Sequence, residues 1–175
     1  VSPTIFDQIR LDANSPLRNP LKIQNPLGED TSIMRTIALP SMLDILSRNA
    51  NYHNKAAKLY ELAKIYLPVE GQVLPEEPKM LLLGTYGANE NFFTLKGELD
   101  AILAGLRLSK ASYIADTTNP SYHPGRCAKV SIDGVDVGVM GQVHPLVAKN
   151  YGIDVDVYCA EINFTKLLDL QLPDP

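Results

Sequence analysis

Hydrophobic residues recur at helical spacing between residues 39 and 52. Four of them share one face of a helical repeat: Leu39, Leu43, Leu46 and Ala50. Pro40 suits the first turn of a helix, because the N–H that proline lacks would have no partner there. The pattern therefore predicts a helix over residues 39–52.

Further helices are predicted from similar patterns and from their caps. Thr94 is a candidate N-cap. The helix that follows it carries one apolar face, made of Leu95, Leu99, Ile102, Leu103 and Leu106. His144 and Pro145 open a short helix that ends near Gly152, and Thr165 caps a last helical turn. By contrast, prolines interrupt residues 1–28, where we expect only short extended pieces at residues 6–11 and 21–25.

Strand patterns fill most of the remaining chain. They cover residues 58–67, 80–86, 111–115, 127–132, 135–143 and 155–162. Asp133 and Gly134 separate two of these segments and form a strong hairpin signal. Strands that pair mainly with their sequence neighbours, with helices set aside, indicate an antiparallel sheet and an α+β fold.

Composition and charge indicate a single globular domain and argue against two other classes, nucleic-acid-binding modules and membrane-spanning proteins. The chain has 175 residues, of which 45% are hydrophobic, so we expect one domain over residues 1–175 with a substantial core. The net charge of −4 argues against a dedicated nucleic-acid-binding module. No apolar run approaches the roughly 20 residues that a membrane span requires. The missing initiator Met and the proline-rich end lead us to expect a fragment of a longer chain.

Cysteine and histidine are too sparse for a metal or disulfide framework. Cys127 and Cys159 lack C-x-x-C spacing, so we expect two free thiols in a reducing compartment. The three histidines are scattered singly, which argues against a zinc site. The adjacent carboxylates within residues 28–31 could hold Mg²⁺. Such a run more often begins a structural element, which we favour, and Arg35 is close enough in sequence to pair with it.

Three segments carry a family resemblance. They read NPLGEDTSIMRTIALPSMLDILSRN at residues 25–49, KLYELAKIYLP at 58–68 and HPGRCAKVSIDGVDVGVMGQVHP at 123–145. Together they resemble the catalytic-like, non-catalytic domain of the bacterial phenylalanyl-tRNA synthetase β chain. The resemblance implies a class II aminoacyl-tRNA synthetase-like antiparallel sheet flanked by helices.

The resemblance also implies which partner chain, enzyme and cellular compartment to expect. The expected partner is the α chain, in a cytoplasmic enzyme of two α and two β chains that uses ATP and Mg²⁺ to join phenylalanine to its tRNA. Contact with tRNA(Phe) through the complete enzyme stays open. We expect no catalytic residue, cofactor or metal within this chain itself.

Two arginines that hold the nucleotide in class II enzymes are missing. By the resemblance, the first belongs to an Arg-x-Glu strand, and Leu59 stands in its place, before Tyr60 and Glu61. Lys58 is adjacent but points to the other face of the strand. The second belongs to a glycine-rich strand that runs into a helix, whereas residues 160–168 contain neither the glycines nor the arginine.

Three other positions have a chemical and a structural interpretation. His144 can cap a helix, which we favour over a remnant of the phenylalanine pocket. His123 and Arg126 suit either a turn, which we favour, or contact with an anion or partner. A Cys127–His123 nucleophile lacks a third, orienting group.

The helix at residues 39–52 has an apolar arc wider than one core requires. Its shoulder adds Met42, Ile45, Asn49 and Tyr52, which extend the arc to roughly 180° where about 100° suffices. In the family that the chain resembles, helices from this part of the class II core form the interface between the chains. The surplus arc and this resemblance together predict that these residues form the candidate subunit interface, with Ile45 and Tyr52 partly exposed in this chain. The alternative is that the loop at residues 70–78 covers them.

Three alternative functions make different demands on the sequence. A regulatory paralogue would bind an amino acid in the remnant pocket. An active class II ligase would need the missing arginines, and an RNA-binding module would need a basic surface.

Overall fold

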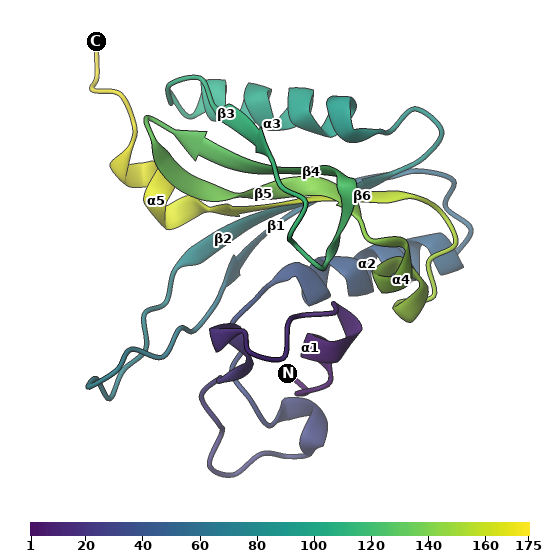
Figure 1. Ribbon diagram of the computed structural model, residues 1–175, viewed down its shortest axis with the longest axis vertical. Helices are drawn as coiled ribbons and strands as arrows, with labels where there is room; N and C mark the ends of the chain where they lie inside the picture. The colour runs from purple at the N-terminus through teal and green to yellow at the C-terminus, as the bar shows by residue number, and fades with distance from the viewer.

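A six-stranded antiparallel sheet organises the chain in a computed structural model that describes residues 1–175 (Figure 1). The strands are β1 (Ala57–Lys64), β2 (Lys79–Tyr86), β3 (Ser112–Ala115), β4 (Tyr122–Ile132), β5 (Val135–Val143) and β6 (Val157–Asn163). Their order is β1-β2-β6-β5-β4-β3, so β1 and β3 are the edge strands. The predicted α+β class is confirmed.

Five α-helices accompany the sheet. They are α1 (Ile5–Gln8), α2 (Leu39–Asn51), α3 (Phe92–Gly105), α4 (Pro145–Asn150) and α5 (Phe164–Asp169). Two 3-10 turns occur before α2, at Pro16–Arg18 and Glu29–Thr31. Figure 1 shows α3 on one side of the sheet and α2, α4 and the N-terminal segment on the other.

Two hydrophobic clusters therefore form, one on each face of the sheet. Alternate residues of β6 divide between them, because successive side chains of a strand point to opposite faces. Val157 and Cys159 join the cluster under α2, while Ala160 and Ile162 join the cluster under α3. Gly84 lets α2 approach closely, because a Cβ there would lie 2.6 Å from the Met42 sulfur.

The β4–β5 hairpin turns at the predicted Asp133-Gly134 pair. These residues have φ of 50° and 77°, as a tight hairpin turn with a left-handed backbone requires. The first strand of the hairpin starts at Tyr122, five residues before the predicted start. A register shift between Tyr122 and Cys127 lets β4 run through Pro124 and Gly125.

Three local predictions were wrong. Asn91, not Thr94, is the N-cap of α3, and Thr94 completes a capping box with it. Asn163 caps α5, while the Thr165 hydroxyl accepts a hydrogen bond from the Lys79 N–H. Residues 5–8 form a helix instead of an extended piece, because helical spacing buries Ile5 and Ile9 on one side.

Candidate functional site

The outer shoulder of α2 is open to solvent. Ile45 is partly exposed, and Tyr52 exposes 82% of its surface. Asn49 donates to the Ile45 carbonyl at 3.0 Å and accepts from the Asn54 amide at 3.1 Å. Met42 differs from these three residues, because it is fully buried against the sheet and has no surface available to a partner.

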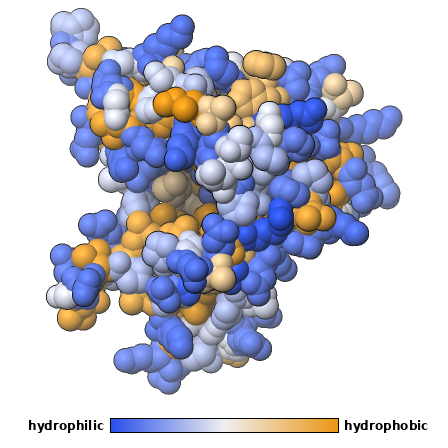
Figure 2. Space-filling model, in the orientation of Figure 1, coloured by the Kyte–Doolittle hydropathy of each residue, from blue (hydrophilic) through white to orange (hydrophobic).

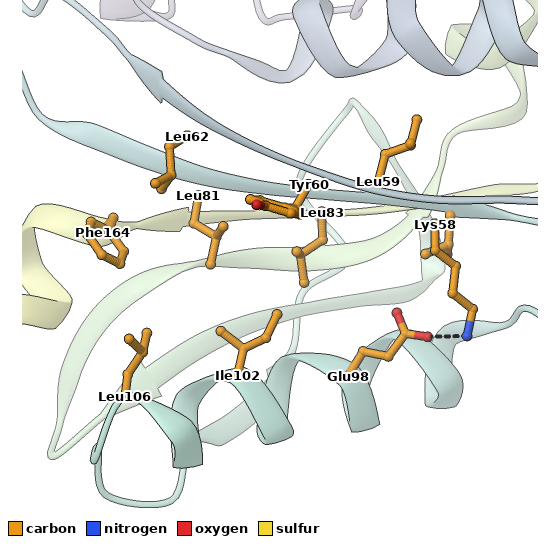
Figure 3. Close-up of a pocket in the computed structure, with 11 residues that line it drawn as sticks. Lys58, Leu59, Tyr60, Leu62, Leu81, Leu83, Glu98, Ile102, Leu106 and Phe164 are labelled. Atoms are coloured by element: carbon orange, nitrogen blue, oxygen red, sulfur yellow. Dashed lines mark ion pairs between the residues drawn. The ribbon is translucent and has the colours of Figure 1, made fainter.

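An apolar trough lies on the other face, between the β1–β2 end of the sheet and α3. Its volume is about 520 Å³. The lining comes from four elements: Lys58, Leu59, Tyr60, Leu62, Leu81, Leu83, Thr85, Glu98, Ile102, Leu106 and Phe164. Figure 2 shows a mostly hydrophilic surface with a hollow near α5, and Figure 3 shows side chains of β1, β2 and α3 facing one another across the trough.

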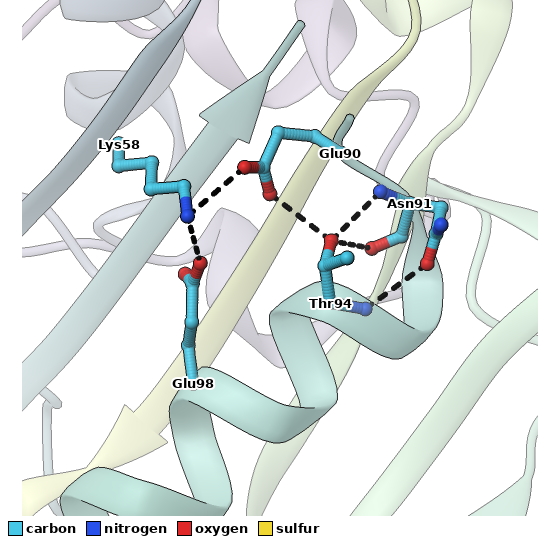
Figure 4. Close-up of polar contacts among 5 residues, drawn as sticks. All are labelled: Lys58, Glu90, Asn91, Thr94 and Glu98. Carbon is cyan, nitrogen blue, oxygen red and sulfur yellow. Dashed lines mark hydrogen bonds and ion pairs between the residues drawn. The ribbon is translucent and has the colours of Figure 1, made fainter. Parts of the chain in front are cut away.

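Lys58 is the one cation that lines this trough, and two carboxylates hold it (Figure 4). Its Nζ lies 2.7 Å from Glu98 Oε1 and 3.2 Å from Glu90 Oε1. The hydrogen bonds to Glu98 and then Glu90 raise the pKa of the Lys58 ammonium. Thr94 donates to the other Glu90 oxygen at 3.0 Å, so the capping box of α3 also positions this carboxylate.

Leu59, which stands in the place of the first arginine, lies in a hydrophobic environment. It packs against the cluster under α2. Glu61 points to the same face and accepts a hydrogen bond of 3.1 Å from the Ser41 hydroxyl of α2. The face of β1 that carries Leu59 is thus occupied by core packing and by a contact with α2.

The end of β6 and the start of α5 are also occupied by structural contacts. The Asn163 side chain accepts from the Lys166 N–H at 3.0 Å. The Lys166 ammonium donates to the Asp136 carbonyl at 3.2 Å. Phe164 points into the apolar trough (Figure 3). No guanidinium lies at this junction.

Comparison with known proteins gives the family. Residues 1–164 match the family described as "Phenylalanyl tRNA synthetase beta chain CLM domain". The chain belongs to this family of catalytic-like domains. Phenylalanine–tRNA ligase β subunits from Clostridium acetobutylicum and Clostridium tetani are 43% and 44% identical over 97% and 95% of the chain. The β subunit from Geobacter metallireducens is 35% identical over 95% of the chain, which covers 22% of that relative.

This β-chain domain spans about a fifth of the length of the curated relatives it matches, with 21% of each Clostridium protein covered. The family and the six-stranded sheet agree with the class II synthetase-like core that the sequence predicted. No group of three or more His, Cys, Asp or Glu side chains is arranged to hold a metal ion. None of its helices combines the length and the hydrophobicity that crossing a membrane would demand.

One buried carboxyl group, that of Glu161, could not be recognised from the sequence. Glu161 lies in β6 on the α2 side and accepts a hydrogen bond of 2.7 Å from the Tyr122 hydroxyl. Burial raises the pKa of Glu161 to about 7, and the bond from Tyr122 opposes the rise. Because 39 residues separate the two partners, only the pairing of strands reveals this contact.

Cys127 and Cys159 are free and buried, as predicted. Both pair with Gly141, from the two sides of β5, so they lie two strand spacings apart, about 10 Å. A disulfide requires Cα atoms within roughly 7 Å. Burial also raises the pKa of Cys127 to about 12, which argues against a thiolate nucleophile.

The histidines perform structural roles. His144 Nδ1 accepts from the Leu146 N–H at 3.1 Å, so the predicted cap of α4 is confirmed. Burial lowers the pKa of His144, and the nearby charge of Arg10 lowers it further, which keeps this acceptor nitrogen unprotonated. His123 lies within β4, so the predicted turn does not form, and its Nδ1 accepts from the Gly125 N–H at 3.0 Å.

Arg126 borders a second cavity, at the N-terminal end of α3. This cavity of about 790 Å³ has aromatic walls formed by Phe92, Phe93, Tyr113 and Tyr158. Arg126 donates to the Gln142 side chain at 2.6 Å, and Asp156 also lines the space.

Residues 28–31 contain a 3-10 turn and hold together locally, since the Thr31 hydroxyl donates to the Gly28 carbonyl at 3.2 Å. The expected pairing with Arg35 does not form. Arg35 Nε instead donates to the Lys64 carbonyl at 2.7 Å, beside the sheet edge.

Proposed function

We propose that this chain is a non-catalytic structural and interaction domain of a phenylalanine–tRNA ligase β subunit. In this proposal, residues 1–175 form one domain of a longer β chain. The domain pairs with the α catalytic chain and supports its geometry while the α chain charges tRNA(Phe) with phenylalanine, using ATP and Mg²⁺.

One observation supports the non-catalytic role. The positions at which the family's arginines would hold the nucleotide are occupied by side chains that make packing or capping contacts. Leu59 is partly buried and packs against the α2-side core, and the α5 start has an asparagine cap and Phe164 in place of an arginine. Lys58 cannot replace a planar guanidinium, because its ammonium is held by Glu90 and Glu98. Loss of one preorganised charge contact typically costs about 10²–10³ in rate.

The surface proposed for the α chain is the shoulder of α2. Three residues supply it: Ile45, Asn49 and Tyr52. Tyrosine is enriched at the energetic centre of protein interfaces, and Tyr52 is among the most exposed large side chains of the chain. Met42 is left out because it is buried.

The test uses a β subunit that contains this domain, mixed with its α chain. Ile45→Asp combined with Tyr52→Ala should weaken assembly of the heterotetramer at least tenfold in analytical ultracentrifugation, and aminoacylation should fall with it. Leu27→Ala is the matched control, since Leu27 is fully exposed on a loop before α2. Unchanged assembly of the double variant would place the interface elsewhere.

The one-domain proposal has a separate test. Residues 1–175 should unfold in urea in a single transition that is the same by fluorescence and by far-UV circular dichroism. Two separated transitions would show that the chain contains two independently unfolding domains.

A second candidate function rests on the 790 Å³ cavity. Its aromatic walls suit an apolar amino acid, while Arg126 and Asp156 could meet the carboxylate and the ammonium. Calorimetry with phenylalanine tests this candidate. Binding that Arg126→Ala abolishes would favour a regulatory amino-acid site, and no heat of binding would reject it.

A further inference from the structure

The edge strand β1 leaves backbone groups without partners. In an antiparallel pair, alternate residues turn their N–H and C=O towards the neighbour, and the others turn them outward. The Ile65 N–H donates to the Pro78 carbonyl at 3.1 Å, which places the odd-numbered residues on the β2 side. The backbone groups of Lys58, Tyr60 and Leu62 therefore face outward.

The outward edge is covered only at its far end. Arg35 accepts a bond from the Tyr66 N–H at 2.8 Å and donates through Nε to the Lys64 carbonyl at 2.7 Å. No backbone hydrogen bond outside the sheet involves Lys58, Tyr60 or Leu62. Proteins normally blunt such an edge with proline, a bulge or a covering segment. Between Lys58 and Leu62 this edge has no proline and no bulge, and no backbone hydrogen bond covers it. Its one charged side chain that faces the trough, Lys58, is paired with Glu90 and Glu98.

The same three residues turn their side chains into the apolar trough (Figure 3). Tyr60 exposes 75% of its surface and Leu62 exposes 51%. Leu81 and Leu83 form the floor, and the opposite wall comes from Ile102 of α3 and from Leu106, which follows the helix. A strand added to the edge would satisfy the outward backbone groups and place alternate side chains in this trough.

Charge and polarity differ between the two ends of the trough. Near Lys58, Glu90 and Glu98 leave an excess of one negative charge (Figure 4). Thr85 lies opposite Lys58 in the sheet, and its buried hydroxyl has no hydrogen-bond partner. A cationic side chain that reached this end would meet Glu98, whose side chain is 33% exposed, and would lie near the nearly buried Glu90.

We propose that β1 accepts an extended segment of a partner protein as a seventh strand. The segment runs antiparallel to β1, presents apolar side chains to the trough at alternate positions, and carries a cation near its C-terminal end, beside Glu90 and Glu98. This surface is separate from the α2 shoulder and lies on the other side of the sheet. The two proposals can therefore fail independently.

The first experiment uses a synthetic peptide of about seven residues, an ordinary strand length. Valine at alternate positions, threonine between them and a C-terminal arginine supply the required pattern. Its addition to the ¹⁵N-labelled chain should slow amide hydrogen exchange of Lys58, Tyr60 and Leu62 at least fivefold. Leu59 and Glu61, whose amides already bond to β2, should change little. A control peptide with asparagine in place of each valine should leave all five amides unchanged.

A proline substitution separates strand addition from simple hydrophobic contact. Tyr60→Pro removes an N–H that bonds to nothing in the protein, and edge strands tolerate proline at such positions. It should weaken peptide binding at least tenfold, whereas Tyr60→Ala, which keeps the N–H, should weaken it about threefold. Leu62→Lys, which places a charge in the trough, provides a second variant if the proline variant does not fold.

Three results would overturn the proposal. The first is unchanged exchange of the outward amides at saturating peptide. The second is equal binding of the peptide to the parent and to both Tyr60→Pro and Leu62→Lys. The third is protection of the same amides without peptide in a concentration-dependent manner, which would show that a second copy of the chain occupies the edge.

Discussion

The two faces of the sheet are covered to different extents. On one face, α2, α4 and the N-terminal segment pack against the strands, and the cluster there extends from β1 to β4. On the other face, α3 packs mainly on β5 and β6, and α5 reaches β2 and β5 only at the end of the sheet. A helix is about 10 Å wide and strands are about 4.8 Å apart, so one helix covers roughly two strands. The trough on β1 and β2 is the part of this face that α3 borders but does not cover.

This difference distinguishes a surface that stabilises the fold from one that is available for recognition. The α2-side cluster consists of 19 buried side chains, so replacing one of them removes packing. Side chains in the trough are partly exposed and contribute less to folding, so they can be specialised for contact. The predictions below test that division, beginning with the largest effect.

Truncating a leucine on each face should give very different losses of stability. Leu82→Ala removes a fully buried side chain from the α2-side cluster and should lower the free energy of unfolding by about 2–5 kcal/mol. Leu62→Ala in the trough should cost less than about 1 kcal/mol, because half of the side chain is already exposed. Urea unfolding of both variants measures the difference. Equal losses would show that the trough belongs to the core.

The buried Glu161 should make stability fall as the pH rises. Its folded-state pKa of about 7 lies above the ordinary value of 4.5, so the folded protein binds this proton more tightly than the unfolded chain does. The resulting stability is fully present below pH 4.5 and is lost as the pH rises through about 7. The loss is on the order of 3 kcal/mol.

Glu161→Gln should remove this loss, since the amide stays neutral. Urea unfolding at pH 5 and pH 8 should show a smaller pH effect in the variant than in the parent. Glu70→Gln, an exposed change in the β1–β2 loop, controls for the altered net charge. The same pH dependence in the Glu161 variant and the parent would contradict burial as the cause of the shift.

Removing the cap of α3 should cost less than a core truncation. Asn91 accepts hydrogen bonds from the Phe93 and Thr94 N–H groups at 2.8 and 3.0 Å. Asn91→Ala should lower the free energy of unfolding by about 1 kcal/mol. It should also loosen Glu90, because the adjacent Thr94 hydroxyl bonds to that carboxylate. An NMR titration of the Lys58 ammonium would detect the loosening as a lower pKa.

The smallest effect is expected from the exposed side of α3. Gly97 lies inside the helix, and a Cβ there would meet no atom within 4 Å. Gly97→Ala should therefore raise the free energy of unfolding by about 0.5–1 kcal/mol, measured as an increase in Tm. A loss of stability would mean that α3 is packed on this side too.

Short-range features were predictable because their causes lie close together in the chain. The repeat of Leu39, Leu43 and Leu46 is enough to place α2, and Asp133-Gly134 is enough to place the β4–β5 turn. The free cysteines and the cap at His144 also followed from local pattern. The exact caps did not, since Asn91 and Thr94 are both suitable and the backbone chooses between them.

Long-range features were decided by the tertiary structure alone. The strand order brings the Tyr122 hydroxyl to the Glu161 carboxyl and buries that carboxyl, which raises its pKa. No local sequence pattern contains this pair of residues. The ion pairs of Lys58 join β1 to the segment that starts α3, and the trough needs four separate elements. Met42 belonged to the apolar arc by sequence, but the close approach at Gly84 buried it and left Ile45 and Tyr52 outside. Periodicity states which residues share a face, whereas packing decides how much of that face is covered.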